Sequence, residues 1–141
     1  MKLKIFLITV TAFILCFISC GKEPKNGEYK GTFKGRLETD TSITNYTTVY
    51  YFNIIHSTKK ELRIEEKLSQ ITSVLKKHEA DSISGKIGFG GVYPLSPSVS
   101  FNFISIAGKY DKKSIIGTFS TTFGDENKEY LSEGNFIISA Y

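Results

Sequence analysis

The stretch 27–38, GEYKGTFKGRLE, constrains the fold of this chain more than any other. Its odd-numbered positions carry Gly, aromatic or aliphatic residues, and its even-numbered positions carry charged residues or Thr. A period of two is typical of a β-strand with one buried and one solvated face. Three glycines, Gly27, Gly31 and Gly35, fall on the buried face, which indicates a sharp bend or the close approach of another element.

Seven further strands are predicted at similar spacing. Stretches rich in Thr, Ser, Val, Ile and aromatic residues alternate with short polar or Gly-containing turn segments. The predicted strands are 46–55, 60–66, 71–78, 82–89, 99–110, 114–122 and 129–140. In the strand 99–110 the apolar residues shift from odd to even positions after Phe103, which predicts a β-bulge. Eight strands with short turns predict an all-β, up-and-down antiparallel barrel, which leaves no strand edge exposed.

The segment 60–77 has a competing interpretation. Four aliphatic residues in it are spaced as one stripe of an amphipathic helix, and no Gly or Pro interrupts them. They are Ile64, Leu68, Ile71 and Leu75. A helix here would leave six strands and one helix. We favour strands because the turn signals on both sides are evenly spaced.

The N-terminus differs in character from the rest of the chain. Lys2 and Lys4 precede an uncharged apolar run, 5–18, and Cys20 follows close behind. The run has the length of the apolar region of a signal peptide, and it is shorter than the roughly 20 residues that a membrane-spanning helix needs. We therefore expect a signal peptide, and the alternatives are an uncleaved anchor or a secretory signal with an incidental cysteine.

Residues 17–20, Phe-Ile-Ser-Cys, resemble the lipobox of bacterial lipoproteins. The resemblance implies that Cys20 receives a diacylglyceryl thioether, that the signal peptide 1–19 is removed, and that the new amino terminus is acylated. Two or more acyl chains hold a protein stably on a membrane, since each buried CH₂ contributes about 0.8 kcal/mol. Gly21 stands where an aspartate retains many such lipoproteins in the inner membrane, which implies a cell-envelope protein of the outer membrane.

After cleavage, a lipidated cysteine with a short tether, 20–26, and one domain, 27–141, would remain. About 120 residues can bury roughly two-thirds of their unfolded surface, so one core is sufficient. Cys16 leaves with the signal peptide, and the blocked Cys20 cannot form a disulfide, so packing alone stabilises the domain. The remaining chain carries a net charge of +2 without clustered lysines, which excludes a nucleic-acid-binding surface.

Gly27-Glu28-Tyr29, at the start of the first predicted strand, resembles the Gly-x-Trp motif of lipocalins, with Tyr in place of Trp. The resemblance implies a lipocalin-like, or calycin-like, small barrel. The arginine that lipocalins carry on the last strand is missing, since the only arginines are Arg36 and Arg63. The resemblance therefore implies a fold and no particular ligand.

Six aromatic residues are predicted to face the interior: Tyr29, Phe33, Phe101, Phe103, Phe119 and Phe136. Eight-stranded barrels are either filled by side chains or hold one small ligand. In a hollow barrel these residues would line a site for a small apolar or amphipathic ligand, with Tyr29 as its polar group. The number of large rings favours a mostly filled interior.

The predicted loop 90–98 is the other candidate for binding. Val92, Tyr93 and Leu95 lie there between glycines and prolines and would expose apolar groups. In this interpretation the barrel is solid, and it docks another envelope protein as an inhibitor or accessory subunit.

No catalytic or metal-binding constellation stands out. His56 and His78 are the only histidines, and both lie near predicted turns. A metal site usually needs three or four His, Cys or carboxylate ligands, and the Gly-x-Ser-x-Gly motif of a nucleophilic serine is missing. We therefore expect no enzymatic activity, no metal and no cofactor.

Overall fold

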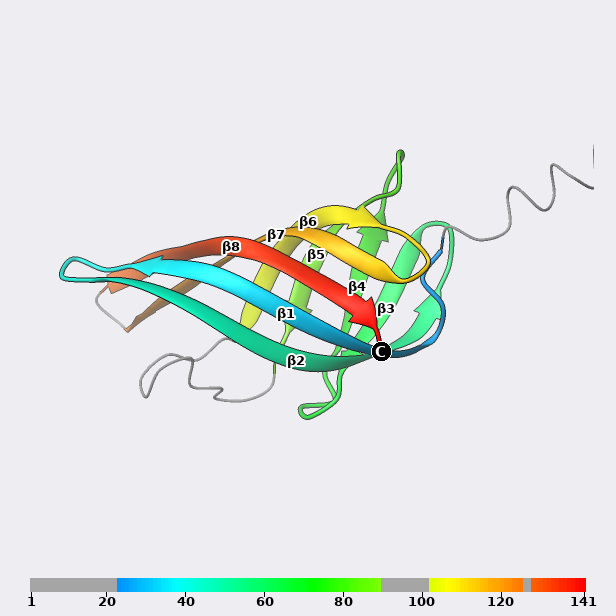
Figure 1. Cartoon of the computed structure of the whole chain (residues 1–141), viewed down its shortest axis with the longest axis horizontal. Helices are drawn as coiled ribbons and strands as arrows, with labels where there is room; N and C mark the ends of the chain where they lie inside the picture. Colours follow the sequence, from blue (N-terminus) through cyan, green and yellow to red (C-terminus); the bar gives the residue numbers. More distant parts are fainter. Residues whose placement is uncertain (1–22, 90–101, 126–127) are drawn as a thin grey trace, which may run out of the picture.

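A computed structural model of the protein describes residues 23–89, 102–125 and 128–141 (Figure 1). They form a closed barrel in which each strand pairs antiparallel with the next and β8 pairs with β1. The strands are β1 (Gly27–Glu38), β2 (Ile43–Ser57), β3 (Glu61–Glu66), β4 (Thr72–Lys77), β5 (Ser82–Gly88), β6 (Phe103–Tyr110), β7 (Ser114–Asp125) and β8 (Lys128–Ala140). The predicted eight-stranded up-and-down barrel is confirmed.

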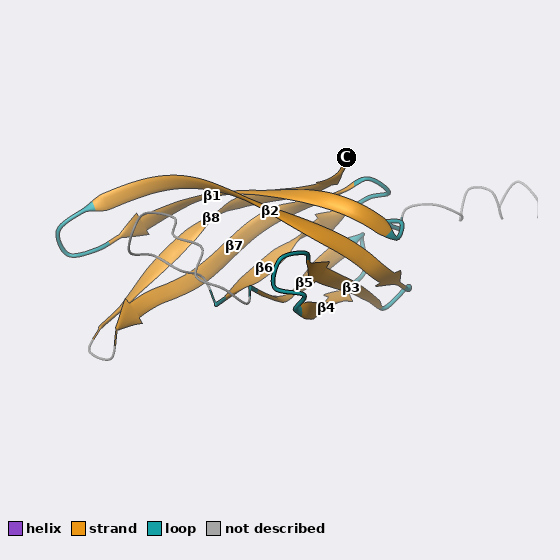
Figure 2. Cartoon of the chain, turned by 90° about the horizontal axis from the view of Figure 1, so that it is seen from below, coloured by secondary structure: helices purple, strands orange, loops and turns teal. Residues whose placement is uncertain are grey.

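The segment 60–77 forms two strands, β3 and β4, and no helix occurs in the described parts of the chain (Figure 2). Ile64 and Leu75 are fully buried, but Leu68, from the same predicted stripe, is 73% exposed in the turn between the strands. Glu66 stabilises this turn, because its buried carboxylate accepts hydrogen bonds from the backbone N–H groups of Leu68 (3.1 Å) and Ser69 (2.8 Å). The helical alternative is therefore wrong.

Two of the three glycines of β1, Gly31 and Gly35, make room for aromatic rings, as predicted, whereas Gly27 is exposed and a Cβ atom there would meet nothing within 4 Å. A Cβ atom on Gly31 would lie 2.6 Å from the ring of Phe52 and 2.9 Å from the ring of Phe33. A Cβ atom on Gly35 would overlap the ring of Tyr46, its direct partner on β2. Only glycine therefore allows these rings to lie against β1.

The β-bulge predicted after Phe103 is wrong. The pairing of β6 with β5 runs without a shift from Phe103 onward. Ile104 and Ile106 are buried, so Phe103 lies on the outer face of the barrel. The irregularity that occurs is in β2, where the pairing with β3 shifts between Ile54 and His56.

Because the strands run up and down, the turns alternate between the two ends of the barrel. The turns 58–60, 78–81 and 111–113 lie at the same end as the first described residues, 23–26, and the C-terminus. We call this the tether end; it is on the right in Figure 1. The turn 39–42, between β1 and β2, lies at the opposite end.

Candidate functional site

The interior of the barrel contains aromatic rings packed round Phe33. Five rings of the described residues have centroids between 5.6 and 6.3 Å from that of Phe33: Tyr50, Phe52, Phe89, Phe119 and Phe136. Four of these contacts are edge-to-face, the geometry that aromatic pairs favour, and Phe136 is stacked. All six side chains are at most 3% exposed. Phe33, which is 1% exposed, is therefore enclosed by these side chains.

The aromatic residues predicted to face inward divide into three groups. Tyr29, Phe33, Phe119 and Phe136 are buried, as predicted. Phe103 is 50% exposed, and its predicted inward orientation is wrong. Phe101 lies outside the described residues.

The sequence interpretation missed three inward rings, those of Tyr50, Phe52 and Phe89. The run Tyr50-Tyr51-Phe52 places aromatic residues on both faces of β2, so its alternation alone does not identify the buried face. The pairing with β1 supplies the missing signal, because Phe52 lies opposite the inward-facing Tyr29.

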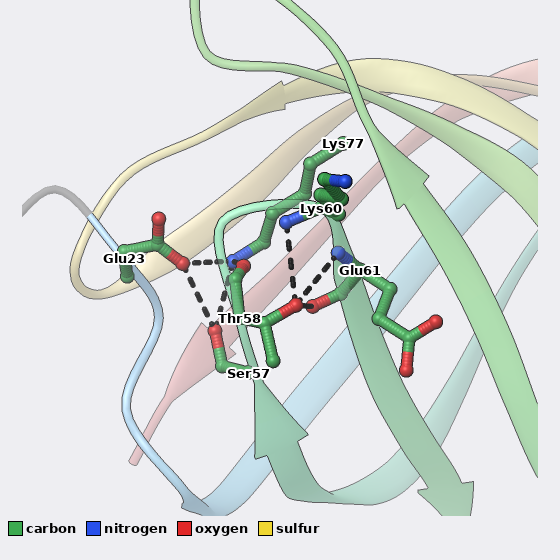
Figure 3. A network of polar contacts seen from close by, with 6 residues as sticks. All are labelled: Glu23, Ser57, Thr58, Lys60, Glu61 and Lys77. Carbon is green, nitrogen blue, oxygen red and sulfur yellow. Dashed lines mark hydrogen bonds and ion pairs between the residues drawn. The ribbon is translucent and has the colours of Figure 1, made fainter.

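A buried lysine lies at the tether end of the barrel and is surrounded by polar partners (Figure 3). Lys77 is the last residue of β4, and its side chain is fully buried. Its ammonium group forms an ion pair with Glu23 and donates hydrogen bonds to the Ser57 hydroxyl (2.8 Å) and the Thr58 carbonyl oxygen (2.7 Å). The Nζ atom also lies 4.9 Å from the centroid of the Tyr110 ring. All three N–H donors have acceptors, as a buried ammonium group requires.

The end of β2 and the β2–β3 turn present two of these acceptors, Ser57 and Thr58. The Thr58 hydroxyl accepts hydrogen bonds from the backbone N–H groups of Lys60 (3.2 Å) and Glu61 (3.1 Å), as Figure 3 shows. This side-chain-to-backbone bonding is typical of Ser and Thr in turns. It fixes the backbone so that the Thr58 carbonyl oxygen is directed at Lys77.

The described part of the tether, 23–26, is attached to the barrel. Glu23 binds Lys77 and also accepts a hydrogen bond from the Ser57 hydroxyl (3.3 Å). Pro24 is buried. The Tyr29 hydroxyl, which we considered as the polar group of a ligand site, donates to the carbonyl oxygen of Lys25 (3.0 Å). Burial raises the pKa of this hydroxyl, so it stays protonated and bound to the tether.

A row of three aliphatic side chains and one threonine crosses the outside of four neighbouring strands. Ile116 of β7 lies opposite Ile137 of β8, Ile137 lies opposite Thr32 of β1, and Thr32 lies opposite Val49 of β2. The two isoleucines and the valine are exposed. We call Ile116, Ile137, Thr32 and Val49 together the outer row. Exposed lysines flank it: Lys30 and Lys34 on β1, and Lys109, which lies opposite Ile116 on β6.

The outer row continues from Val49 into a groove of about 520 Å³. Apolar and aromatic side chains line much of the groove, namely Val49, Tyr51, Leu68 and Tyr141. The Tyr51 and Tyr141 rings meet edge to face, with centroids 5.8 Å apart. Glu28 accepts hydrogen bonds from Lys67 (2.6 Å) and Tyr141 (3.1 Å) beside it, and these bonds lower the pKa of its carboxyl group.

No group of three His, Cys, Asp or Glu side chains is placed to hold a metal ion in residues 23–89, 102–125 and 128–141. The same residues contain no helix long and apolar enough to span a membrane. Both histidines are exposed, and Nε2 of His78 lies 2.8 Å from the Ser84 hydroxyl.

Two sets of predicted functional residues lie outside the described residues: Cys20, and the loop residues Val92, Tyr93 and Leu95. Comparisons of the chain with protein-family models, curated proteins and solved structures gave no match. The geometry of the barrel is therefore the basis on which a function can be proposed.

Proposed function

We propose that the protein is a lipid-anchored lipoprotein of the bacterial cell envelope, whose barrel binds another envelope protein through its outer surface. The observation that carries this proposal is the set of five aromatic rings packed round Phe33. An apolar ligand inside the barrel would have to occupy the space that these rings take. The packing therefore supports an interaction protein over a carrier of a small apolar ligand.

The outer row supports the same proposal and suggests the chemistry of the partner. Ile116 and Ile137 are exposed side by side on β7 and β8, and Thr32 of β1 links them to the exposed Val49 of β2. Contiguous exposed apolar groups on a soluble domain are typical of interaction surfaces. Because Lys30 and Lys34 flank the row, we propose a partner surface with an apolar centre and acidic residues at its rim.

A photo-crosslinking side chain at position 137, in the full-length protein in intact cells, tests this function. We expect one discrete adduct with an envelope protein. Position 74 is the matched control, because Val74 is also an exposed aliphatic residue, but it lies on β4, opposite β8 in the closed barrel. Replacing Lys30 and Lys34 by Glu should reduce the adduct at position 137. The same adducts at both positions would contradict the proposal.

Titration with a fluorescent fatty-acid analogue separates the proposal from its main alternative. A barrel that is filled round Phe33 should give no saturable binding. Saturable binding that a Phe33→Trp substitution abolishes would place a ligand in the interior and overturn the proposal. A probe at Tyr93 extends the crosslinking experiment to the predicted loop 90–98.

A further inference from the structure

We infer that the protein docks on the membrane with the tether end of its barrel, and that the ion pair between Glu23 and Lys77 fixes this orientation. The partner surface is the layer of phospholipid headgroups in which the lipid on Cys20 would be inserted. The inference rests on the lipid anchor that is part of the proposed function. It adds which end of the barrel meets the membrane and which residues decide this.

The first step is the number of residues between the lipid and the first described residue, Glu23. Three residues lead from Cys20 to Glu23, and they span at most about 11 Å. Strands such as β8, with 13 residues, are about 40 Å long. The lipid therefore stays close to the tether end and far from the opposite end, at 39–42.

The second step is the strength of the attachment at Glu23. Its partner Lys77 is fully buried and is held by the Ser57 hydroxyl and the Thr58 carbonyl oxygen as well. If Glu23 left this contact, the buried ammonium group would lose the carboxylate that neutralises it (Figure 3). Burial of Pro24 and the hydrogen bond from Tyr29 to Lys25 hold the next two residues. The lipid is thus joined to the barrel through a segment that is already part of the fold.

The third step is the chemistry of the surface presented to the membrane. Five exposed lysines lie on the tether and on two turns of this end: Lys25, Lys59, Lys60, Lys112 and Lys113. Lysines close to a membrane surface are attracted by anionic headgroups. The turns of this end also carry the carboxylates of Glu79, Asp81 and Asp111, and Glu23 and Glu61 lie next to them. Asp111 accepts hydrogen bonds from the backbone N–H groups of Lys113 (2.7 Å) and Ser114 (2.8 Å). The turn 39–42 at the opposite end contains Asp40, which forms an ion pair with Lys128 of β8.

Fluorescence quenching by headgroup-labelled lipid measures the orientation. In the lipidated protein Cys20 is blocked, so a new cysteine can be labelled alone. The positions are Glu79→Cys, on an exposed turn of the tether end, and Thr41→Cys, on an exposed turn of the opposite end. Each full-length protein is expressed in bacteria, purified from membranes and reconstituted into phosphatidylethanolamine–phosphatidylglycerol vesicles. We expect several-fold stronger quenching at position 79 than at position 41.

Glu23→Gln, combined with each label, tests the ion pair. We expect quenching at positions 79 and 41 to become nearly equal, because the barrel can then turn on a longer tether. Glu28→Gln is the matched control, since it removes another carboxylate that pairs with a lysine, Lys67, without touching the tether. This control should leave the difference in quenching between the two positions unchanged. Far-ultraviolet circular dichroism confirms that both variants keep the barrel.

Flotation of the same vesicles separates failure of the orientation from failure of the anchor. If the protein floats but is quenched equally at positions 79 and 41, the orientation is wrong and the lipid anchor stands. If the Glu23→Gln protein keeps the full difference in quenching between positions 79 and 41, the ion pair does not set the orientation. A protein that does not float with the vesicles overturns the anchor and this inference together.

Discussion

Lys77 and Glu23 are 54 residues apart in the chain and form an ion pair at one end of the barrel. The lysine side chain is fully buried, whereas the glutamate is partly exposed. A buried ammonium group is tolerated only with nearby acceptors, so β4 and the β2–β3 turn hold the segment that precedes β1. The first described residues thereby become part of the folded domain.

We predict that Glu23→Ala lowers the free energy of unfolding by about 1–3 kcal/mol, because it leaves the buried Lys77 without its carboxylate. Adding Lys77→Met should restore much of the loss, since an apolar side chain needs no partner there. Urea unfolding followed by circular dichroism measures both. A double variant as unstable as Glu23→Ala would show that the ammonium group is not the cause.

Phe33→Ala should destabilise the barrel by about 3–5 kcal/mol, because it removes the ring at the centre of the aromatic core and leaves a cavity. Phe103→Ala is the matched control, since Phe103 is half-exposed on the outer face. Its change in the free energy of unfolding should be much smaller. Equal losses at the two positions would contradict the observed packing.

Gly31→Ala should lower the free energy of unfolding by about 1–3 kcal/mol through overpacking. Its Cβ atom would lie 2.6 Å from the Phe52 ring and 2.9 Å from the Phe33 ring. Thr32→Ala, on the opposite face of the same strand, serves as the control and should change stability little. Thermal unfolding of the two variants side by side checks the expectation, which a fully stable Gly31→Ala protein would refute.

Stability should fall in alkaline solution, partly through Tyr46. Burial raises the pKa of Tyr46, against the smaller opposing effect of its hydrogen bond with Ser132. The folded state therefore holds the phenolic proton more tightly than the unfolded chain, in which tyrosine titrates near pH 10. The contribution of this proton to the free energy of unfolding is complete below about pH 10, and it is lost as the pH rises through the pKa of Tyr46 in the folded state.

Urea unfolding of the wild type and Tyr46→Phe between pH 8 and pH 11.5 measures this effect. The variant lacks the titrating group, so its stability should decline less steeply above about pH 10. An identical decline in the two proteins would show that other groups cause the loss.

Cys20→Ala should abolish incorporation of fatty acid into the protein, because it removes the only thiol outside the predicted signal peptide. Metabolic labelling with a tagged fatty acid, followed by separation of the membrane fraction, measures this. The wild type should carry the label in the membrane fraction. A labelled variant, or an unlabelled and soluble wild type, would overturn the lipoprotein proposal.

The sequence by itself determined the strands and their order. The alternation in 27–38 predicted β1 with the bounds that the structure has, because a period of two is a local property of an extended chain with one wet face. Short turns between such segments leave antiparallel neighbours as the natural arrangement, and closure then removes the exposed edges. The inward orientation of Tyr29, Phe33, Phe119 and Phe136 followed from the same alternation.

Only the tertiary structure decided which face of an ambiguous strand is buried and which distant residues meet. Phe103 and Ile104 are neighbours on β6, so only one of them can face the interior. With the unbroken pairing of β6 with β5, the buried residue is Ile104. The partners of Lys77 come from the tether and the β2–β3 turn, and no local pattern marks a lysine at a strand end as buried. The physical reason is that alternation is encoded by neighbours in the chain, whereas register and the contacts at the barrel ends depend on how all eight strands close.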